Sequence, residues 1–389
     1  MVAGHLQEKK GKIYIVLCYR DENGKKRTKW ISTGLDVKGN KKKAQDMLNE
    51  ARKSFKPPTA EPIEDIMFTN YMKKWLAMVK PNIELTTYAS YSNSVLSIIC
   101  PYFEEKHILL KDIQPVHIQD FYTHCMNVRG VSASTVIHYH ANIRKALKYA
   151  VDTDILMTNP ADKIQRPKMQ KFIGKFYDVD EVNDLFKVIS GTRIELPVMM
   201  AAFYGLRRSE IVGLKWDAID FKNRTITIKH TVTDVIIDNK LVTVEKDRAK
   251  NKASHRTLPL VDEFFDILSK AKSQQDEYRI LCGRSYNNKF LDYIFVDEMG
   301  NRTRPNFLTE NFRNTLMKNN LRRIRFHDLR HTAASLLLNA GVSMKEIQEW
   351  LGHSDFGTTA NYYSHLDVNA KLRSADAMLS TGMKLALPA

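Results

Sequence analysis

Two proline-containing segments divide this chain of 389 residues into three parts. KPPTAEPIED (56–65) and NPADKIQRPKMQK (159–171) combine proline with polar residues, a composition typical of extended linkers. A chain of this length is long enough for two or three domains, each with a core of its own. We therefore predict domains at residues 1–56, 66–158 and 175–389.

The first part is strongly basic and has the pattern of a small sheet packed on a helix. Residues 1–56 contain 15 Lys and Arg against 6 Asp and Glu, so 15 − 6 = +9 of the chain's net charge of +16 lies here. KIYIVLCYR and RTKWISTG read as two strands joined through Asn23-Gly24. A helix follows, with apolar spacing at Ala44, Met47, Leu48 and Ala51. The local charge favours DNA as the partner over a merely solvated surface.

The second part shows helical apolar spacing throughout, whereas the third mixes helices with β-hairpins. Residues 224–246 predict a hairpin that turns at Asp238-Asn239, followed by a second turn into HRTLPL. Two helices begin with the spacing of capping boxes, at Asp178 with Glu181 and at Ser343 with Glu346. The predicted fold class is a multidomain α+β chain: a small basic β-sheet-plus-helix N-terminal domain, an all-α middle domain, and a mainly α C-terminal domain with β-hairpins.

Short stretches of the third part carry the residues best suited to chemistry. AAFYGLRRSEIVGLKW places Arg207 in an apolar helix pattern, where an arginine is costly unless it meets an anion or an acid. IRFHDLRHTAASLLLNAG puts His327 and Arg330 on one face at the start of a helix. EWLGHSD contains His353, and TTANYYSHL contains the adjacent Tyr362 and Tyr363. Each stretch alone is weak evidence for chemistry, because such arginine–histidine and tyrosine pairs are common on protein surfaces and in protein cores.

Taken together and in this order, GLRRSE, a hairpin lysine, HDLRH, LGHSD and a nearby tyrosine resemble the tyrosine recombinase (integrase) family. The resemblance covers the third part and extends weakly into the second, which is similar to the family's core-binding domain. The basic first part resembles the arm-binding domain of phage and conjugative-transposon integrases. The implied function is a site-specific DNA recombinase that integrates and excises a mobile element through a 3′-phosphotyrosine intermediate.

The resemblance also implies a set of catalytic residues. It assigns Arg207 and Arg330 to the scissile phosphate, with His327 and His353 beside it, and predicts that Glu210 orients the active-site arginine. The catalytic lysine falls in KDRAKNKASHRTLPL. Lys250 best fits the family's K-T-x-x-S-x-R pattern, and Lys252 is the alternative because Asn stands where Thr is usual.

The nucleophile is expected to be Tyr363. The family commonly has Tyr-Ser/Thr-His at this point, which matches Tyr363-Ser364-His365. Adjacent residues of a helix point about 100° apart, so one of the two tyrosines faces the phosphate. Tyr362 then fills the position before the nucleophile.

Cleavage of a phosphodiester by a tyrosine requires the same kinds of residues, whatever the family. Attack on a phosphodiester builds negative charge on the non-bridging oxygens, which two guanidinium groups can bind. Free tyrosine has a pKa near 10, so only about 0.1% is phenolate at neutral pH, and neighbouring groups must favour ionisation. The departing 5′ oxygen needs a proton, which a lysine can supply. We expect no cofactor: no metal, because no acidic triad is required, and no ATP, because the phosphotyrosine bond conserves the energy of the broken link.

Other functions fit the sequence less well. A DNA-binding regulator on the same scaffold should have lost one or more of the catalytic residues. A metal-dependent transposase or nuclease would draw on Asp217, Asp220 and Asp328, which have no partner at metal-site spacing. A serine recombinase would need a nucleophilic serine near the N-terminus. A chromosome-dimer resolvase would typically lack the extra basic N-terminal domain.

The expected partners are double-stranded DNA, at core-type and arm-type sites, and further copies of the chain, with a tetramer on paired sites. The tail at 374–389 resembles the segment that family members dock onto a neighbour, and an accessory excision factor is a further candidate partner. No membrane is expected, since no apolar run approaches the roughly 18–20 residues of a spanning helix. Without a signal peptide and with four scattered cysteines, the chain is predicted to be a cytoplasmic bacterial protein, associated with the nucleoid when acting.

Overall fold

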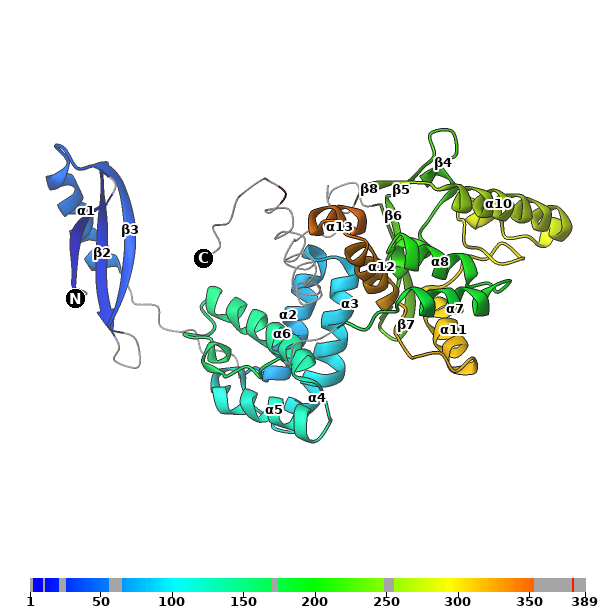
Figure 1. The fold of residues 1–389 in the computed structure, drawn as a ribbon. Coiled ribbons are helices and arrows are strands. Elements are labelled where there is room, and N and C mark those ends of the chain that lie inside the picture. The colour runs from blue at the N-terminus through cyan, green and yellow to red at the C-terminus, as the bar shows by residue number, and fades with distance from the viewer. Residues whose placement is uncertain are drawn as a thin grey trace, which may run out of the picture. The chain divides into compact units, whose positions relative to one another are not determined.

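The computed structural model of the chain describes residues 3–9, 11–20, 26–55, 65–169, 174–247 and 255–352, together with Ser380. Figure 1 shows the elements coloured in chain order, and the chain divides into two compact units. The first unit consists of Met1–Lys74, Cys100–Val128 and Ile143–Gln165, and the second of Trp75–Ile99, Arg129–Asn142 and Arg166–Ala389.

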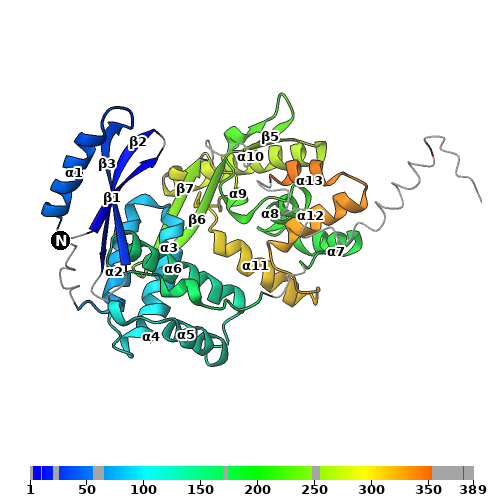
Figure 2. The same ribbon diagram turned by 90° about the vertical axis from the view of Figure 1, so that its left-hand side faces the viewer.

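The N-terminal part of the first unit is an antiparallel sheet with one helix packed on it. Strands β1 (Ala3–Lys9), β2 (Lys12–Arg20) and β3 (Lys26–Asp36) pair in that order, and α1 (Lys41–Ser54) follows (Figure 2). Ile15 and Leu17 of β2 form a small core with Leu48 of α1. The predicted strands and helix are confirmed, whereas β1 is an addition that its mostly polar sequence did not indicate. The turn residues Asn23-Gly24 lie outside the described residues.

Residues 66–158 are predicted to be all helical, and the structure confirms helices joined by short turns and loops, with an antiparallel bridge between Met67 and Leu109. In the first unit, the rings of Phe68, Phe103 and Phe121 pack with centroids 4.9 and 5.5 Å apart. The longer elements are α2 (Phe68–Val79), α3 (Leu85–Ser94), a π-helical turn η2 (Val95–Ile99), α4 (Cys100–Glu104), α5 (Pro115–Asn127) and α6 (Ala133–Asp152). Short 3₁₀ turns η1 (Lys80–Asn82), η3 (Leu110–Asp112) and η4 (Pro160–Lys163) connect them.

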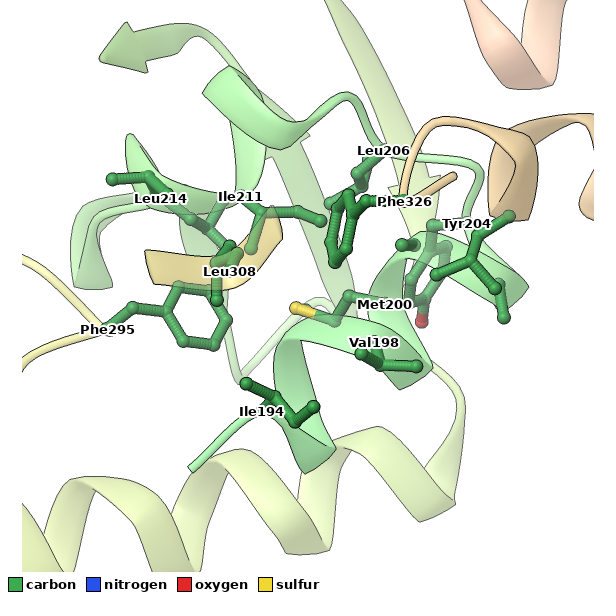
Figure 3. Close-up of a cluster of buried hydrophobic side chains, with 14 of the residues drawn as sticks. Ile194, Val198, Met200, Tyr204, Leu206, Ile211, Leu214, Phe295, Leu308 and Phe326 are labelled. Carbon is green, nitrogen blue, oxygen red and sulfur yellow. The ribbon is translucent and has the colours of Figure 1, made fainter. Parts of the chain in front are cut away.

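The C-terminal part, from residue 174, is built on one large apolar core. Figure 3 shows Val198 and Met200 of α8 gathered with Leu308 of α11 and with Phe326 from the segment before α12. Its helices are α7 (Val179–Ile189), α8 (Glu195–Phe203), α9 (Arg208–Val212), α10 (Asp262–Cys282), α11 (Pro305–Lys318), α12 (Asp328–Asn339) and α13 (Met344–Leu351). The 3₁₀ turns are η5 (Trp216–Ala218), η6 (Gly283–Ser285) and η7 (Asn288–Phe290).

The β-strands of this part pair differently from the sequence expectation. The first strand of the predicted hairpin is divided at Lys229 into β5 (Thr225–Ile228) and β6 (His230–Ile237). Strand β5 pairs with β4 (Ile219–Asp220) and with β8 (Arg256–Pro259), whereas β6 pairs with β7 (Lys240–Asp247). The predicted second hairpin, from β7 into HRTLPL, is therefore wrong. Burial explains the pairing, because Ile226 lies opposite Leu258 and both belong to the C-terminal core.

The local signals are confirmed where the structure describes them. Asp238 and Asn239 have φ angles of 51° and 59°, the conformation that a tight hairpin turn requires. Asp178 and Ser343 each accept a hydrogen bond from the amide of the glutamate three residues later, so both capping boxes form.

All four cysteines are free thiols that form no disulfide. None of the helices described here has the length and apolarity needed to span a membrane.

Candidate active site

Arg207 lies at the N-terminus of α9, where a sharp turn after α8 places it. Gly205 makes this turn possible with a φ of +63°, and a side chain there would bring its Cβ to 2.3 Å from Leu351 Cδ2. The Arg207 side chain is 30% exposed, and its Nη1 donates to Glu210 Oε1 at 2.9 Å. The backbone amide of Arg207 also donates to Oε2 of the same glutamate, at 2.9 Å. Both ends of Arg207 are thus fixed by one carboxylate.

Glu210 is completely buried and holds two arginines. Besides Arg207, its Oε2 accepts a hydrogen bond from Arg256 Nη2 at 3.1 Å, and the Arg256 side chain is 6% exposed. Burial alone would raise the pKa of Glu210. The positive charges of Arg256 and Arg207 outweigh that effect and lower the pKa to about 2. The carboxylate is therefore ionised at neutral pH, and its two hydrogen bonds hold Arg207 in position.

Arg330 joins three segments through backbone carbonyl groups. It lies in the first turn of α12 and is 2% exposed. Its Nη1 donates to the carbonyl of Gly205 and its Nη2 to the carbonyl of Leu351, each at 2.6 Å. Arg207 Nη2 donates to the next carbonyl, that of Gly352, at 3.4 Å. The two arginines therefore meet at the end of α13.

His327 stands at the N-cap of α12, beside both arginines. Although part of the side chain is exposed to solvent, desolvation by the surrounding atoms lowers its pKa, and the charges on His331, Arg330 and Arg207 add to this effect. The resulting pKa is about 4, so the imidazole is neutral at pH 7. The ring of His331 lies against that of His327, with centroids 5.4 Å apart.

The end of α13 is fixed by aromatic packing. The indole of Trp350 stacks on the ring of Tyr204, with centroids 5.9 Å apart and planes 19° apart, and its N–H donates to the carbonyl of Phe203 at 3.4 Å. Gly352 ends the helix with a φ of +67°, the left-handed conformation that glycine adopts readily. His353 is the next residue of the chain.

The structure thus brings together Arg207, His327 and Arg330, with Glu210 paired to Arg207. The other predicted site residues, and the tail at 374–389, lie outside the described residues: Lys250 and its alternative Lys252, His353, Tyr363 and its neighbour Tyr362. Two residues near the site were given no role from sequence. Arg256 is the last letter of the K-x-x-x-S-x-R match, and His331 follows Arg330 directly, so both stood in quoted motifs.

The carboxylates considered for a metal-dependent enzyme have protein partners. Asp217 pairs with Lys229 at 2.8 Å, and Asp220 accepts hydrogen bonds from the backbone amides of the turn that follows it. Asp328, which is buried, pairs with Arg325 at 2.7 Å. Within the described ranges, no group of three or more His, Cys, Asp or Glu side chains is arranged to hold a metal ion.

Chemically, the site suits a tetrahedral anion. The site holds the part-exposed guanidinium of Arg207, the buried guanidinium of Arg330, whose Nη atoms donate to backbone carbonyls, and a neutral imidazole that can accept or donate a proton. A phosphodiester that gains negative charge as it is attacked is the kind of group that such an arrangement stabilises.

Comparison with known proteins gives the family. The model of the "Phage integrase family" matches residues 175–370, and that of the "Phage integrase, N-terminal SAM-like domain" matches residues 67–126. A curated relative, "Tyrosine recombinase XerC-like" of Caldanaerobacter subterraneus subsp. tengcongensis, is 28% identical over 389 aligned residues that cover 95% of this chain and 97% of the relative.

Two solved structures show the likeness in fold. The Tn1549 transposon integrase in complex with a circular intermediate DNA has a TM-score of 0.66 at 17% identity, covering 80% of this chain and 99% of that one. A lambda integrase tetramer bound to a Holliday junction has a TM-score of 0.54 at 15% identity, covering 90% of this chain and 95% of that one. Because the first family model spans half of the chain, the chain belongs to the phage integrase family and is a tyrosine-type site-specific DNA recombinase.

Proposed function

We propose that this recombinase integrates and excises a mobile element, with Arg207 and Arg330 binding the scissile phosphate and Tyr363 attacking it. One observation carries the proposal. Arg207 and Arg330 donate to the carbonyl groups of Gly352 and Leu351, immediately before His353 in the chain, and both lie close enough to His327 for their charges to lower its pKa. A nucleophile ten residues further on can be delivered to a phosphate held at this place.

The proposed step exchanges one phosphoester bond for another. The Tyr363 oxygen forms a bond to phosphorus, the bond from phosphorus to the 5′ oxygen breaks, and the 3′ end stays attached to the enzyme. Lys250, or Lys252 as the alternative, gives a proton to the departing 5′ oxygen. His327 is neutral at pH 7 and can accept the phenol proton, and a bound phosphate would raise its pKa toward the range of an effective base. The 5′ hydroxyl of a second strand reverses the step and joins the new partners, so no cofactor is required.

The nucleophile is tested with a suicide substrate, a duplex that loses its 5′ end after cleavage and so traps the covalent adduct. Tyr363→Phe should bind this DNA as wild type does and form no adduct, because it lacks the attacking oxygen. Tyr362→Phe is the matched control and should retain most adduct formation. Adduct from Tyr363→Phe but not from Tyr362→Phe would reverse the assignment.

The arginines are best tested at Arg207, because Arg330 also bridges two buried carbonyl groups and its replacement would disturb the fold. Arg207→Lys keeps the charge but loses the planar fork. We expect it to bind DNA and to cleave about 10²–10³-fold more slowly, on the scale of about 3–4 kcal/mol for one lost transition-state donor. A rate near that of wild type would remove Arg207 from the active site.

The three predicted domains divide the DNA contacts between them. Residues 1–56 are proposed to bind arm-type sites, and residues 66–158 and 175–389 the core-type site. The face of the N-terminal sheet opposite α1 supports this role, because Trp30 is 44% exposed there and the ammonium of Lys9 lies 5.5 Å from its ring centroid. Deleting residues 1–60 should abolish arm-site binding and leave cleavage of a core-site duplex largely intact. Loss of both activities would refute an independent arm-binding domain.

Assembly is proposed to follow the lambda integrase, whose solved structure is a tetramer on a Holliday junction. We propose that the tail at 374–389 packs on a neighbouring copy, and that an accessory excision factor sets the direction of the reaction. The enzyme would act in the cytoplasm, at the nucleoid. Truncation after Arg373 should weaken assembly on paired sites more than binding to a single half-site. Equal losses would place the tail in the core of its own domain.

A further inference from the structure

A network of polar side chains closes the open end of the β6–β7 hairpin. His230 is the first residue of β6 and is 8% exposed. Its Nδ1 lies 2.5 Å from Oδ1 of Asp247, the last residue of β7, and its Nε2 lies 3.1 Å from the hydroxyl of Tyr293. That hydroxyl donates to Glu245 at 3.0 Å, and Arg302 pairs with the same carboxylate. The network thus ties both strands of the hairpin to the segment after η7.

The proton positions in this network follow from its members. Burial raises the pKa of Tyr293 to about 12, so the phenol stays protonated and its hydroxyl donates a hydrogen bond to Glu245. The pKa of Asp247 is lowered by its hydrogen bond to His230, so this carboxylate is ionised and can only accept. Nδ1 of His230 therefore donates to Asp247, and its Nε2 faces the Tyr293 hydroxyl. Loss of any member leaves another without its partner.

The ring of Tyr293 is itself held in place. It is 4% exposed, the guanidinium of Arg302 lies 4.9 Å from its centroid, and the ammonium of Lys215 lies 5.0 Å away. A short antiparallel bridge also pairs Lys215 with Tyr293, and Gln275 donates to the Tyr293 carbonyl at 3.4 Å. Tyr293 is consequently a fixed point to which the hairpin end is bound.

The place of this anchor in the chain gives it a consequence for catalysis. Asp247 is the residue at which β7 ends, and Lys250 and Lys252 follow it by three and five residues. Consecutive Cα atoms are about 3.8 Å apart, so a stretch of three residues reaches no further than roughly 11 Å from Asp247. A general acid works only within hydrogen-bond reach of the oxygen it protonates, and a displacement of about 1 Å can cost about 10²-fold in rate.

We propose that His230 and Tyr293 are positioning residues that fix the end of β7 and thereby the lysine that protonates the departing 5′ oxygen. This inference rests on the proposed function, in which that proton comes from Lys250 or Lys252. It assigns no contact with DNA to either residue. Their effect should therefore be confined to the step that needs the proton.

The test compares two DNA substrates that differ in one atom. In one, the bridging 5′ oxygen at the cleavage point is replaced by sulfur, whose thiolate leaves without a proton because thiol pKa values are near 8.5. We expect Tyr293→Phe, which loses only the hydroxyl, to cleave the oxygen substrate about 10- to 100-fold more slowly than wild type. On the sulfur substrate it should come within about threefold of wild type. His230→Asn should show the same selectivity.

Matched controls separate positioning from general damage. Tyr177→Phe removes a phenol that donates to the carbonyl of Arg322, in the same part of the chain, and should alter neither rate selectively. Arg207→Lys should be slow on both substrates, because phosphate binding is needed in either case. The readout is a ratio of two rates on one preparation, so a fraction of unfolded protein cancels from it.

The outcomes decide the inference and the lysine assignment separately. Equal slowing of Tyr293→Phe on both substrates, or no slowing on the oxygen substrate, would overturn the positioning role. Lys250→Ala and Lys252→Ala are run beside it. If neither of these is rescued by sulfur, the lysine assignment fails, while a selective defect of Tyr293→Phe would still place the hairpin end at the proton donor.

Discussion

Replacing Glu210 with glutamine isolates the contribution of its negative charge, which pairs with Arg207, to the free energy of unfolding. The substitution keeps the size of the side chain and removes the charge that Arg207 and Arg256 face at 2.9 and 3.1 Å. The pKa of Glu210 falls from 4.5 to about 2 in the folded chain, which at about 1.36 kcal/mol per pH unit corresponds to roughly 3 kcal/mol of stability. Breaking a buried ion pair by removing one partner costs about 3–5 kcal/mol, in agreement.

The stabilisation from Glu210 should depend on pH, in a direction that follows from its lowered pKa. The pKa is lower in the folded state than in the unfolded state, so the stabilisation is complete above about pH 4.5 and declines as the pH falls toward 2. Urea denaturation of wild type and Glu210→Gln, followed by circular dichroism, should give a difference of about 3 kcal/mol at pH 7. That difference should shrink by about 1.4 kcal/mol per pH unit below pH 4.5.

Glu349→Gln is the matched control. Glu349 pairs with Lys345 at 3.2 Å, but both side chains are about two-thirds exposed, so its replacement should cost less than about 0.5 kcal/mol. A difference below about 1 kcal/mol for Glu210→Gln at pH 7, or one that does not change between pH 4.5 and 3, would refute the reasoning. Cleavage should also slow, because Arg207 loses the carboxylate that orients it.

Gly205→Ala should lower the free energy of unfolding by about 2–4 kcal/mol, because the residue has a positive φ and its Cβ would meet Leu351. Gly191→Ala, at a φ of +72° with nothing within 4 Å, should cost only the conformational part of about 1–2 kcal/mol, and equal losses in thermal unfolding would contradict the close contact. His327 should titrate well below its usual value of 6.5 in a nuclear magnetic resonance titration of the DNA-free chain, and a midpoint at or above 6.5 would contradict its position beside the two arginines. Because its pKa is lowered on folding, the neutral form contributes stability above pH 6.5 that is lost as the pH falls toward 4.

Much of the local structure could be predicted from the sequence, because its causes lie within a few residues of one another. The capping boxes at Asp178 and Ser343 join positions three apart, and the turn at Asp238-Asn239 needs two residues that tolerate positive φ. The ordered motifs around Arg207, His327 and Arg330 similarly predicted the family, because their residues and order resemble those of tyrosine recombinases. Strand β1 was not predicted because its mostly polar sequence, AGHLQEK, has no alternation of apolar and polar side chains.

The pairing of strands and the partners of charged residues were decided by the tertiary structure. The alternation of Ile226 and Ile228 in β5 resumes at Val232 in β6, so nothing local indicates that β5 pairs with β8 while β6 pairs with β7. The buried carboxylate of Glu210 meets Arg256, 46 residues away, and Arg330 reaches the carbonyl of Gly205 across 125 residues. A buried charge is tolerable only where a partner satisfies it. The sequence by itself determined that Arg207 needs a partner, and the packing of α8, α9, α12 and β8 around one core determined the partners of Arg207, Arg256 and Arg330.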